Sequence, residues 1–210
     1  MAAIPPSGKT LPAPFAAAYL HVMVDLLGPN GVDAVLRLAG LETWIGRPPA
    51  VPDATPADFA DISSLLGALD ETLGSRGGRG LERRMGAKAF QEVLQSAGAL
   101  AAMTDPAFQA FPLERRLRSG MHALGRTLDQ MISAGVSSRE EPGEVVFRFE
   151  ACPSCWGRTS EGPVCAATIG LLAAAAAWMA PEAETTIEET ACRAQGSSTC
   201  DFSIRWEAAA

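Results

Sequence analysis

The hydrophobic period of the chain changes near Gly135, and this change limits the fold more than any other feature of the sequence. Downstream of Gly135, Val145, Phe147 and Phe149 alternate with polar or opposite-face neighbours, as in a strand. Upstream, apolar residues recur at steps of three and four, as on one face of a helix. The clearest such series is Leu113, Leu117, Met121, Leu124, Leu128 and Met131. The sequence therefore predicts an α+β fold, with a helical N-terminal part followed by a small antiparallel sheet.

Turn and cap signals divide the helical part. A first helix is expected over 14–28, where Gly28-Pro29 ends it. Thr55 and Pro56 are typical of a helix start, as cap and first residue, and predict a helix that runs to about residue 73. The segment SRGGRG, 75–80, is expected to break the chain before another long helix begins.

The C-terminal part contains signals for two hairpins and one helix. The sequences SSREE and EVVFRFEAC, separated by Pro142-Gly143, indicate the first hairpin. The sequences TTIEETACRA and CDFSIRW, joined by QGSST, indicate the second. An Ala-rich helix that begins at Pro163 is expected to cross the sheet between them. We expect one domain over 1–210, mainly helical over 1–135, with the sheet, the crossing helix and the cysteine motif over 136–207.

Composition excludes several classes of function. The formal net charge of −7 opposes binding to nucleic-acid phosphates, which normally requires a basic face. The longest apolar stretch, 164–180, is rich in alanine and shorter than the roughly 20 residues of a membrane span. The N-terminal sequence has no pattern of a cleavable signal. We therefore expect no nucleic-acid partner, no membrane span and a cytoplasmic location.

Several short motifs do not support an enzymatic site. GKT at 8–10 lacks the glycine that a phosphate-binding loop needs five residues earlier, because Ala3 stands there. SRGGRG does not have the spacing of a dinucleotide fingerprint. His21 has Asp25 one helical turn away and is interpreted as part of a local pair. His122 borders an apolar stripe and is either a structural histidine or a residue facing a ligand pocket.

Five cysteines lie in the last third of the chain, and their odd number fits a disulfide framework poorly. In a reducing compartment a metal site is favoured. Cys192 and Cys200 flank a turn, so paired strands would bring them together, and Cys165 near a helix start is a natural further ligand. Glu189 precedes Cys192 by three residues and would point to the opposite face of a regular strand. Joint ligation therefore requires a bulge or a bend between Glu189 and Cys192.

The CPSC sequence places Cys152 and Cys155 in a separate CxxC pair. Three interpretations remain open for this pair. The two residues are small buried hydrophobes in a tight turn, additional or alternative metal ligands, or a redox pair.

The stretch GPVCAATIGLL…IEETACRAQGSSTCDFSI resembles the 4-vinyl reductase domain family, which includes aromatic-effector sensor domains of phenol-responsive activators. The similarity covers about Val146 to Arg205. It implies that a structural Zn²⁺ is held by Cys165, Glu189, Cys192 and Cys200. The preceding CPSCWGR is similar to stand-alone members described as hydrocarbon-binding proteins. The resemblance also implies a fold related to a vesicle-tethering subunit and to haem-based nitric oxide sensors, often dimeric, with a buried pocket for apolar ligands.

Two functions follow from this resemblance. The first is a sensor or carrier domain, expected to be a homodimer, for a hydrophobic or aromatic molecule, with tetrapyrroles among the candidates. The second is a 4-vinyl reductase, or an accessory protein, in bacteriochlorophyll and tetrapyrrole biosynthesis. A reductase needs a hydride donor and the sequence has no nucleotide or flavin signature, so binding is favoured over catalysis. The candidates to line the pocket are Phe90, Phe108, Met121, His122, Trp156 and Trp178.

Overall fold

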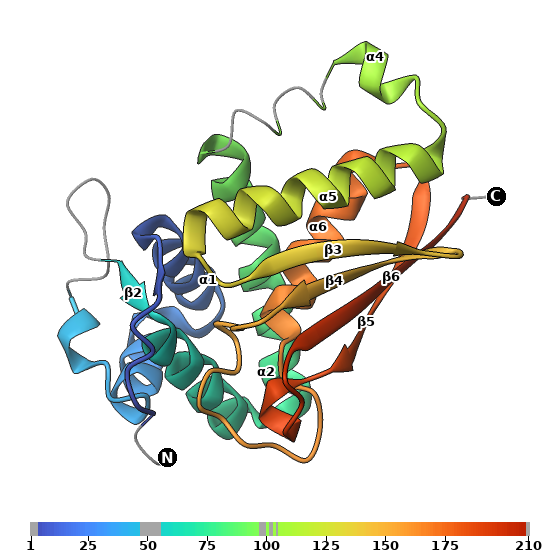
Figure 1. The fold of residues 1–210 in the computed structure, drawn as a ribbon. Coiled ribbons are helices and arrows are strands. Elements are labelled where there is room, and N and C mark those ends of the chain that lie inside the picture. The colour runs from blue at the N-terminus through green and yellow to red at the C-terminus, as the bar shows by residue number, and fades with distance from the viewer. Residues whose placement is uncertain (1–3, 47–55, 97–99, 101–102, 104, 209–210) are drawn as a thin grey trace.

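The computed structural model describes residues 4–46, 56–96, 100, 103 and 105–208. Its helices and a four-stranded antiparallel sheet form the α+β fold expected from the sequence (Figure 1). The main helices are α1 (Ala13–Leu38), α2 (Phe59–Ser96), α5 (Leu113–Ile132) and α6 (Ala166–Met179). The shorter elements are β1 (Thr10–Leu11), η1 (Glu42–Trp44), β2 (Ala57–Asp58), α4 (Pro106–Gln109) and η3 (Arg193–Gln195).

Helices α1 and α2 each bend at a glycine with positive φ, Gly28 (68°) in α1 and Gly74 (70°) in α2. Glycine adopts this conformation without the steric cost that a Cβ would bring. The first bend lies where Gly28-Pro29 was expected to end a helix. The second bend corrects the prediction that SRGGRG breaks the chain. Residues 75–80 are helical, and the break lies before them, at Gly74.

The start of α2 also differs from the prediction. The helix begins at Phe59, after Ala57–Asp58 has paired with β1, and Thr55 lies outside the described residues. The Asp58 carboxylate accepts the backbone N–H of Ala60 at 2.7 Å, which satisfies one of the free donors of the first turn. A short β-pairing therefore positions the N-terminus of α2.

The sheet has the strand order β3-β4-β6-β5, in which all neighbours are antiparallel. Its strands are β3 (Val136–Glu141), β4 (Glu144–Phe149), β5 (Ala183–Ala191) and β6 (Cys200–Ala208). Both predicted hairpins are present, and β6 lies between β4 and β5 in the sheet. The Ala-rich helix connects β4 to β5, but begins at Ala166 rather than at Pro163.

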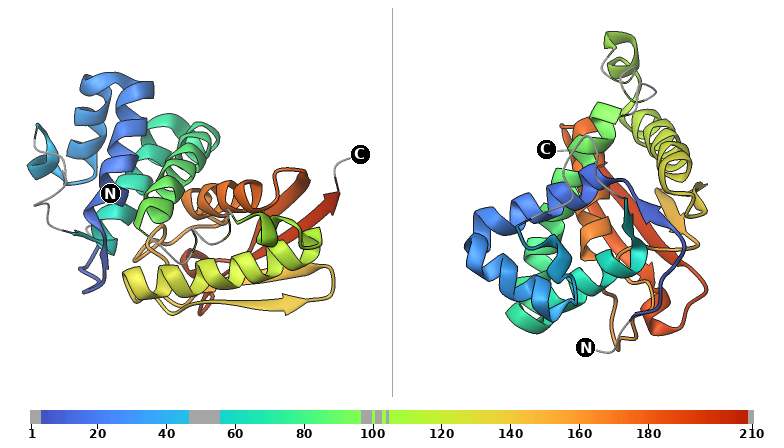
Figure 2. Two further views of the ribbon diagram at one scale, coloured as in Figure 1. Left: turned by 90° about the horizontal axis from the view of Figure 1, so that it is seen from above. Right: turned by 90° about the vertical axis from the view of Figure 1, so that its left-hand side faces the viewer.

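Successive layers run from α1 through α2 and α6 to the sheet (Figure 2). Helix α5 lies over β3 and β4, and α6 lies over β5, so both helices cover the same side of the sheet. Phe147, Phe149 and Phe202 of the sheet are buried in the core. The ring centroids of Phe147 and Phe149 lie 5.6 Å apart, and those of Phe149 and Phe202 lie 6.1 Å apart. Within the ranges that the structure describes, no helix is both long enough and apolar enough to cross a bilayer.

Helices α2 and α6 approach each other at two glycines. A Cβ atom at Gly86 would lie 1.8 Å from the carbonyl oxygen of Ala167, and one at Gly170 would lie 2.0 Å from that of Arg83. Only glycine allows the two backbones to come this close. The crossing fixes the N-terminal end of α6, where Cys165 is the cap residue.

Candidate metal centre

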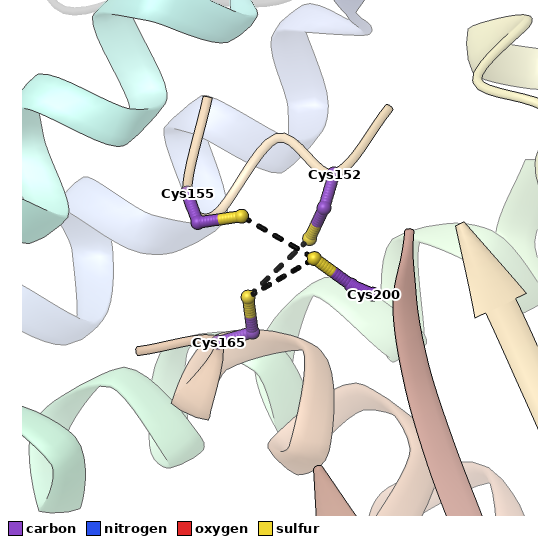
Figure 3. Close-up of side chains that lie close together, drawn as sticks. All are labelled: Cys152, Cys155, Cys165 and Cys200. Carbon is purple, nitrogen blue, oxygen red and sulfur yellow. Dashed lines mark hydrogen bonds between the residues drawn. The ribbon is translucent and has the colours of Figure 1, made fainter. Parts of the chain in front are cut away.

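All five cysteines are buried and come together where the sheet meets the N-terminus of α6. Cys152 and Cys155 lie in the turn after β4, and Cys165 caps α6. Cys192 follows β5, and Cys200 begins β6. Figure 3 shows the sulfurs of Cys152, Cys155, Cys165 and Cys200 pointing toward one another. Four separate segments of the chain thus supply one group of thiols.

The sulfur spacing matches that of a tetrahedral zinc site. The Sγ–Sγ distances are 3.6 Å for Cys152–Cys165, 3.4 Å for Cys155–Cys200 and 3.9 Å for Cys165–Cys200. A tetrahedral ion with Zn–S bonds of about 2.3 Å requires sulfurs about 3.8 Å apart. These four thiols form one group whose ligand atoms all lie within 4.8 Å of one another. The residues present therefore fit a zinc ion.

A second group with the same property consists of Cys165, Glu189, Cys192 and Cys200, the set that the family resemblance implies. The Sγ atoms of Cys165 and Cys192 lie 3.9 Å apart. The pairing register of β5 with β6 shifts between Glu189 and Ala191, and this break in the regular strand is of the kind that joint ligation requires. Glu189 is thereby turned toward the cysteines.

The Glu189 carboxylate has one partnered and one unpartnered oxygen. Its Oε2 accepts the backbone N–H of Cys165 at 2.9 Å, while its buried Oε1 has no hydrogen-bond partner among the described residues. Burial, with a further contribution from the hydrogen bond to Cys192, raises the pKa of Glu189 to about 8. An oxygen in this position suits a metal, which would supply the missing partner.

Hydrogen bonds within the cluster lower the pKa of Cys152 and Cys192, whereas hydrogen bonds with Cys152 raise the pKa of Cys155, Cys165 and Cys200. The backbone N–H of Arg193 donates to the Cys200 sulfur at 3.3 Å. Burial raises the pKa of the Cys152 thiol, but hydrogen bonds with Cys155, Cys165 and Cys200 lower it by more, so it lies well below its ordinary value. Thiolate is the form that binds metal.

The turn that carries Cys152 and Cys155 is held on both sides. Ser154 and Thr168 share a hydrogen bond between their hydroxyls at 3.0 Å, which joins the turn to α6. Arg158 forms an ion pair with Asp70 of α2 at 2.7 Å, and Trp156 Nε1 donates to the carbonyl of Pro5 at 3.1 Å. The CPSC pair is thus fixed beside Cys165 and Cys200.

The structure also places a buried acid near this centre, which the sequence did not predict. Glu82 of α2 has no exposed surface, and neither of its carboxylate oxygens has a hydrogen-bond partner among the described residues. Burial, together with the charge of Asp70, raises the pKa of Glu82 well above its ordinary value. No pattern in the sequence distinguishes this residue, because Glu82 is one of several charges in LERRMG.

Glu82→Gln is expected to reduce the loss of stability at rising pH. The folded protein retains the Glu82 proton where the unfolded chain, with its ordinary pKa of 4.5, has released it. The unfolded state then binds fewer protons, so stability falls as pH rises through this window. The drop in Tm between about pH 5 and about pH 8 should be smaller in the variant. Exposed Glu71→Gln on the same helix serves as control, and parallel pH profiles of Glu82→Gln and wild type would contradict the assignment.

The six candidate pocket residues do not share one site. Phe90 and Trp178 meet edge to face, with a centroid distance of 6.0 Å, and line the same groove. Met121 is fully buried in the core, and Phe108 packs against Phe111. The two remaining candidates also lie elsewhere, Trp156 in the turn described above and His122 on the exposed side of α5, 3.4 Å from the Ser138 hydroxyl.

The groove lined by Phe90 and Trp178 has a volume of about 520 Å³ and lies between α1, α2 and α6. Its wall is mainly apolar, and its polar side includes Arg84 and Lys88, one helical turn apart. Its lining residues are Val22, Asp25, Leu26, Arg84, Ala87, Lys88, Phe90, Gln91, Leu94, Ala174 and Trp178. A second cavity of about 400 Å³, which includes His21 and Trp44, lies between the two halves of α1 and η1.

Comparison with known proteins agrees with the C-terminal motif and with the fold. Residues 145–206 match the family model of the 4-vinyl reductase domain, which confirms the resemblance found in the sequence. None of the curated protein sequences matches the chain.

Solved H-NOX structures share the fold at low sequence identity. An H-NOX from Shewanella woodyi, solved with IWP-051 in the Fe(II)CO state, is 18% identical and has a TM-score of 0.52. The match covers 93% of this chain and 94% of that chain. An H-NOX protein from S. oneidensis in the Fe(II)NO state is 14% identical, with a TM-score of 0.51 and coverage of 90% and 98%.

Proposed function

On the premise that residues 145–206 match the 4-vinyl reductase domain, we propose that this protein is a zinc-containing domain that binds a hydrophobic or aromatic small molecule. The observation that carries the proposal is the groove between α1, α2 and α6, which has room for a compound of drug-like size. The groove and the cysteine cluster lie at different places along α6. Trp178 is near its end, whereas Cys165 caps its start.

The lining of the groove indicates the chemistry of its ligand. Phe90 and Trp178 offer ring faces and edges on which an apolar or aromatic body can pack. Arg84 and Lys88 add two positive charges on adjacent turns of α2, in a chain whose net charge is −7. We therefore propose an apolar ligand with an anionic group, a description that also fits the carboxylates of a tetrapyrrole.

Zinc would have a structural role in this function. Four protein ligands close the coordination sphere and leave no position for a substrate. The metal would join the turn after β4, the N-terminus of α6 and the β5–β6 hairpin, because each of these segments contributes a ligand. Its chemistry is therefore to stabilise the scaffold on which the groove is built.

The second candidate, a 4-vinyl reductase or accessory protein of tetrapyrrole biosynthesis, predicts a tetrapyrrole ligand specifically. Native mass spectrometry of protein from its own host would identify the compound that co-purifies. Oxidation of NADPH in the presence of a vinyl tetrapyrrole would favour the reductase, whereas binding without turnover favours a sensor or carrier.

We also propose a homodimer, on the basis of the family resemblance, and a cytoplasmic location, where the thiols stay reduced. Light scattering should then give about twice the chain mass of 21.9 kDa.

Replacement of Trp178 by alanine is expected to weaken binding of apolar probes by about tenfold, the effect of losing roughly 1.4 kcal/mol of contact. Two fluorescent probes test this, the anion 8-anilinonaphthalene-1-sulfonate and the neutral N-phenyl-1-naphthylamine. The double variant Arg84→Ala/Lys88→Ala should weaken only the anion, because it removes charge and leaves the aromatic wall.

Trp44→Ala is the matched control, since Trp44 belongs to the second cavity. It should leave the Kd of both probes unchanged. If Trp44→Ala weakened the probes and Trp178→Ala did not, the ligand site would be in the second cavity and the proposed groove would be wrong.

A further inference from the structure

The two groups of potential metal ligands have two residues in common. One contains Cys152 and Cys155 and the other contains Glu189 and Cys192, while Cys165 and Cys200 belong to both. The cluster as a whole therefore offers six ligands in two quartets. This exceeds what one tetrahedral ion can use.

A single four-coordinate zinc ion would leave two of the six potential ligands unused. If it took the four thiols of Figure 3, Cys192 and Glu189 would stay uncoordinated, and the buried Glu189 Oε1 has no hydrogen-bond partner among the described residues. If it took the other quartet, Cys152 and Cys155 would remain as buried thiols. A buried carboxylate oxygen without a partner is costly, so the first arrangement is incomplete, and the second leaves two buried thiols of the cluster unused.

We propose that the cluster is a binuclear zinc centre in which the thiolates of Cys165 and Cys200 bridge two ions. Cys152 and Cys155 complete the first ion, and Glu189 and Cys192 complete the second. This inference rests on the proposed function for the presence of zinc and extends it to the number of ions and their ligands. Both ions are four-coordinate, and every one of the six donors is used.

Charge and distance are compatible with this arrangement. Five thiolates and one carboxylate carry −6, and two Zn²⁺ ions reduce this to −2, the same charge as one zinc with four thiolates. The bridging sulfurs are 3.9 Å apart in the structure. Drawing them to about 3.4 Å, with Zn–S bonds of about 2.3 Å, separates the two ions by about 3.1 Å.

The positions of the bridging residues also favour sharing. Cys165 caps α6 and Cys200 begins β6, one of the two inner strands of the sheet, so the two bridges come from elements inside the fold. The terminal ligands come from the turn after β4 on one side and from the end of β5 on the other. Each ion would thus hold one peripheral segment against the shared pair.

The test is the metal content of the full chain, purified with zinc and freed of loosely bound ions. Two zinc ions per chain are expected in the wild type. Cys192→Ser should retain one, in the tetrathiolate quartet, and the double variant Cys152→Ser/Cys155→Ser should retain one in the other. Ser197→Ala is the control, because Ser197 is exposed in the loop between Cys192 and Cys200 and is not a proposed ligand, and it should keep both ions.

Two measurements on the wild type test the proposal even if the variants do not fold. Co²⁺ titration of the metal-free chain should saturate its thiolate charge-transfer band at two equivalents. X-ray absorption at the zinc edge should show a metal neighbour at about 3 Å in addition to the sulfur shell. One ion per chain, with saturation at one equivalent and no metal neighbour, would overturn the binuclear centre and leave the structural zinc intact. A folded chain that binds no zinc would overturn both proposals.

Discussion

Removal of the metal is expected to lower the stability of the folded protein by at least about 5 kcal/mol, or roughly 10 to 20 °C in Tm for a chain of this size. The structural reason is that the ligands lie far apart in sequence. Cys152 follows β4 and Cys200 begins β6, while Cys165 caps α6. Without metal, these segments are joined at the cluster by contacts between thiols and by a few hydrogen bonds, such as the one between Ser154 and Thr168.

Cys165→Ser should remove the metal without a chelator, because Cys165 belongs to both ligand quartets. The variant should lose its tightly bound zinc and melt near the temperature of the chelated wild type. Treatment of the variant with chelator should then have little further effect on Tm. A chelated wild type that melts within a degree or two of the untreated protein would contradict a structural role for the metal.

The periodicity of the sequence was sufficient to predict the class of fold. The steps of three and four from Leu113 to Met131 correspond to α5, and the alternation from Val145 to Phe149 corresponds to β4. Such patterns record which face of an element is buried, and burial decides the element. The position of the break in α2 was not predicted correctly. Of its several nearby glycines, only Gly74 has a non-helical conformation, and that choice depends on packing.

The candidate metal site could be predicted only in part from the sequence. The spacing of Glu189, Cys192 and Cys200 indicated a site and a break in the regular strand, and the structure contains that break. The closeness of Cys155 to Cys200 could not be predicted, because it depends on how the turn after β4 is held by α2 and α6. The charged side of the groove was missed for a similar reason. No pattern in the sequence indicates that Arg84 lies beside α1 and α6, with which it lines the groove.

Gly86→Ala is expected to destabilise the protein by about 3 kcal/mol or more, near or above the usual upper range for overpacked sites. The new Cβ would lie 1.8 Å from the Ala167 carbonyl oxygen and 2.8 Å from the Leu171 amide nitrogen. Both neighbours are backbone atoms of α6, so no side chain can move aside. Relief requires α2 and α6 to separate. Thermal and urea unfolding should show a lower midpoint, by roughly 6 to 12 °C in Tm.

Gly80→Ala is the matched control, because Gly80 lies on the same helix and a Cβ there would meet nothing within 4 Å. Alanine in place of glycine in a helix should stabilise the protein by about 0.5 to 1 kcal/mol, so the two variants should change Tm in opposite directions. Gly86→Ala should also weaken zinc binding, because Ala167 is two residues from Cys165 and the clash displaces the start of α6. Equal effects of the two substitutions would show that helix propensity, and not the close crossing, determines stability at these positions.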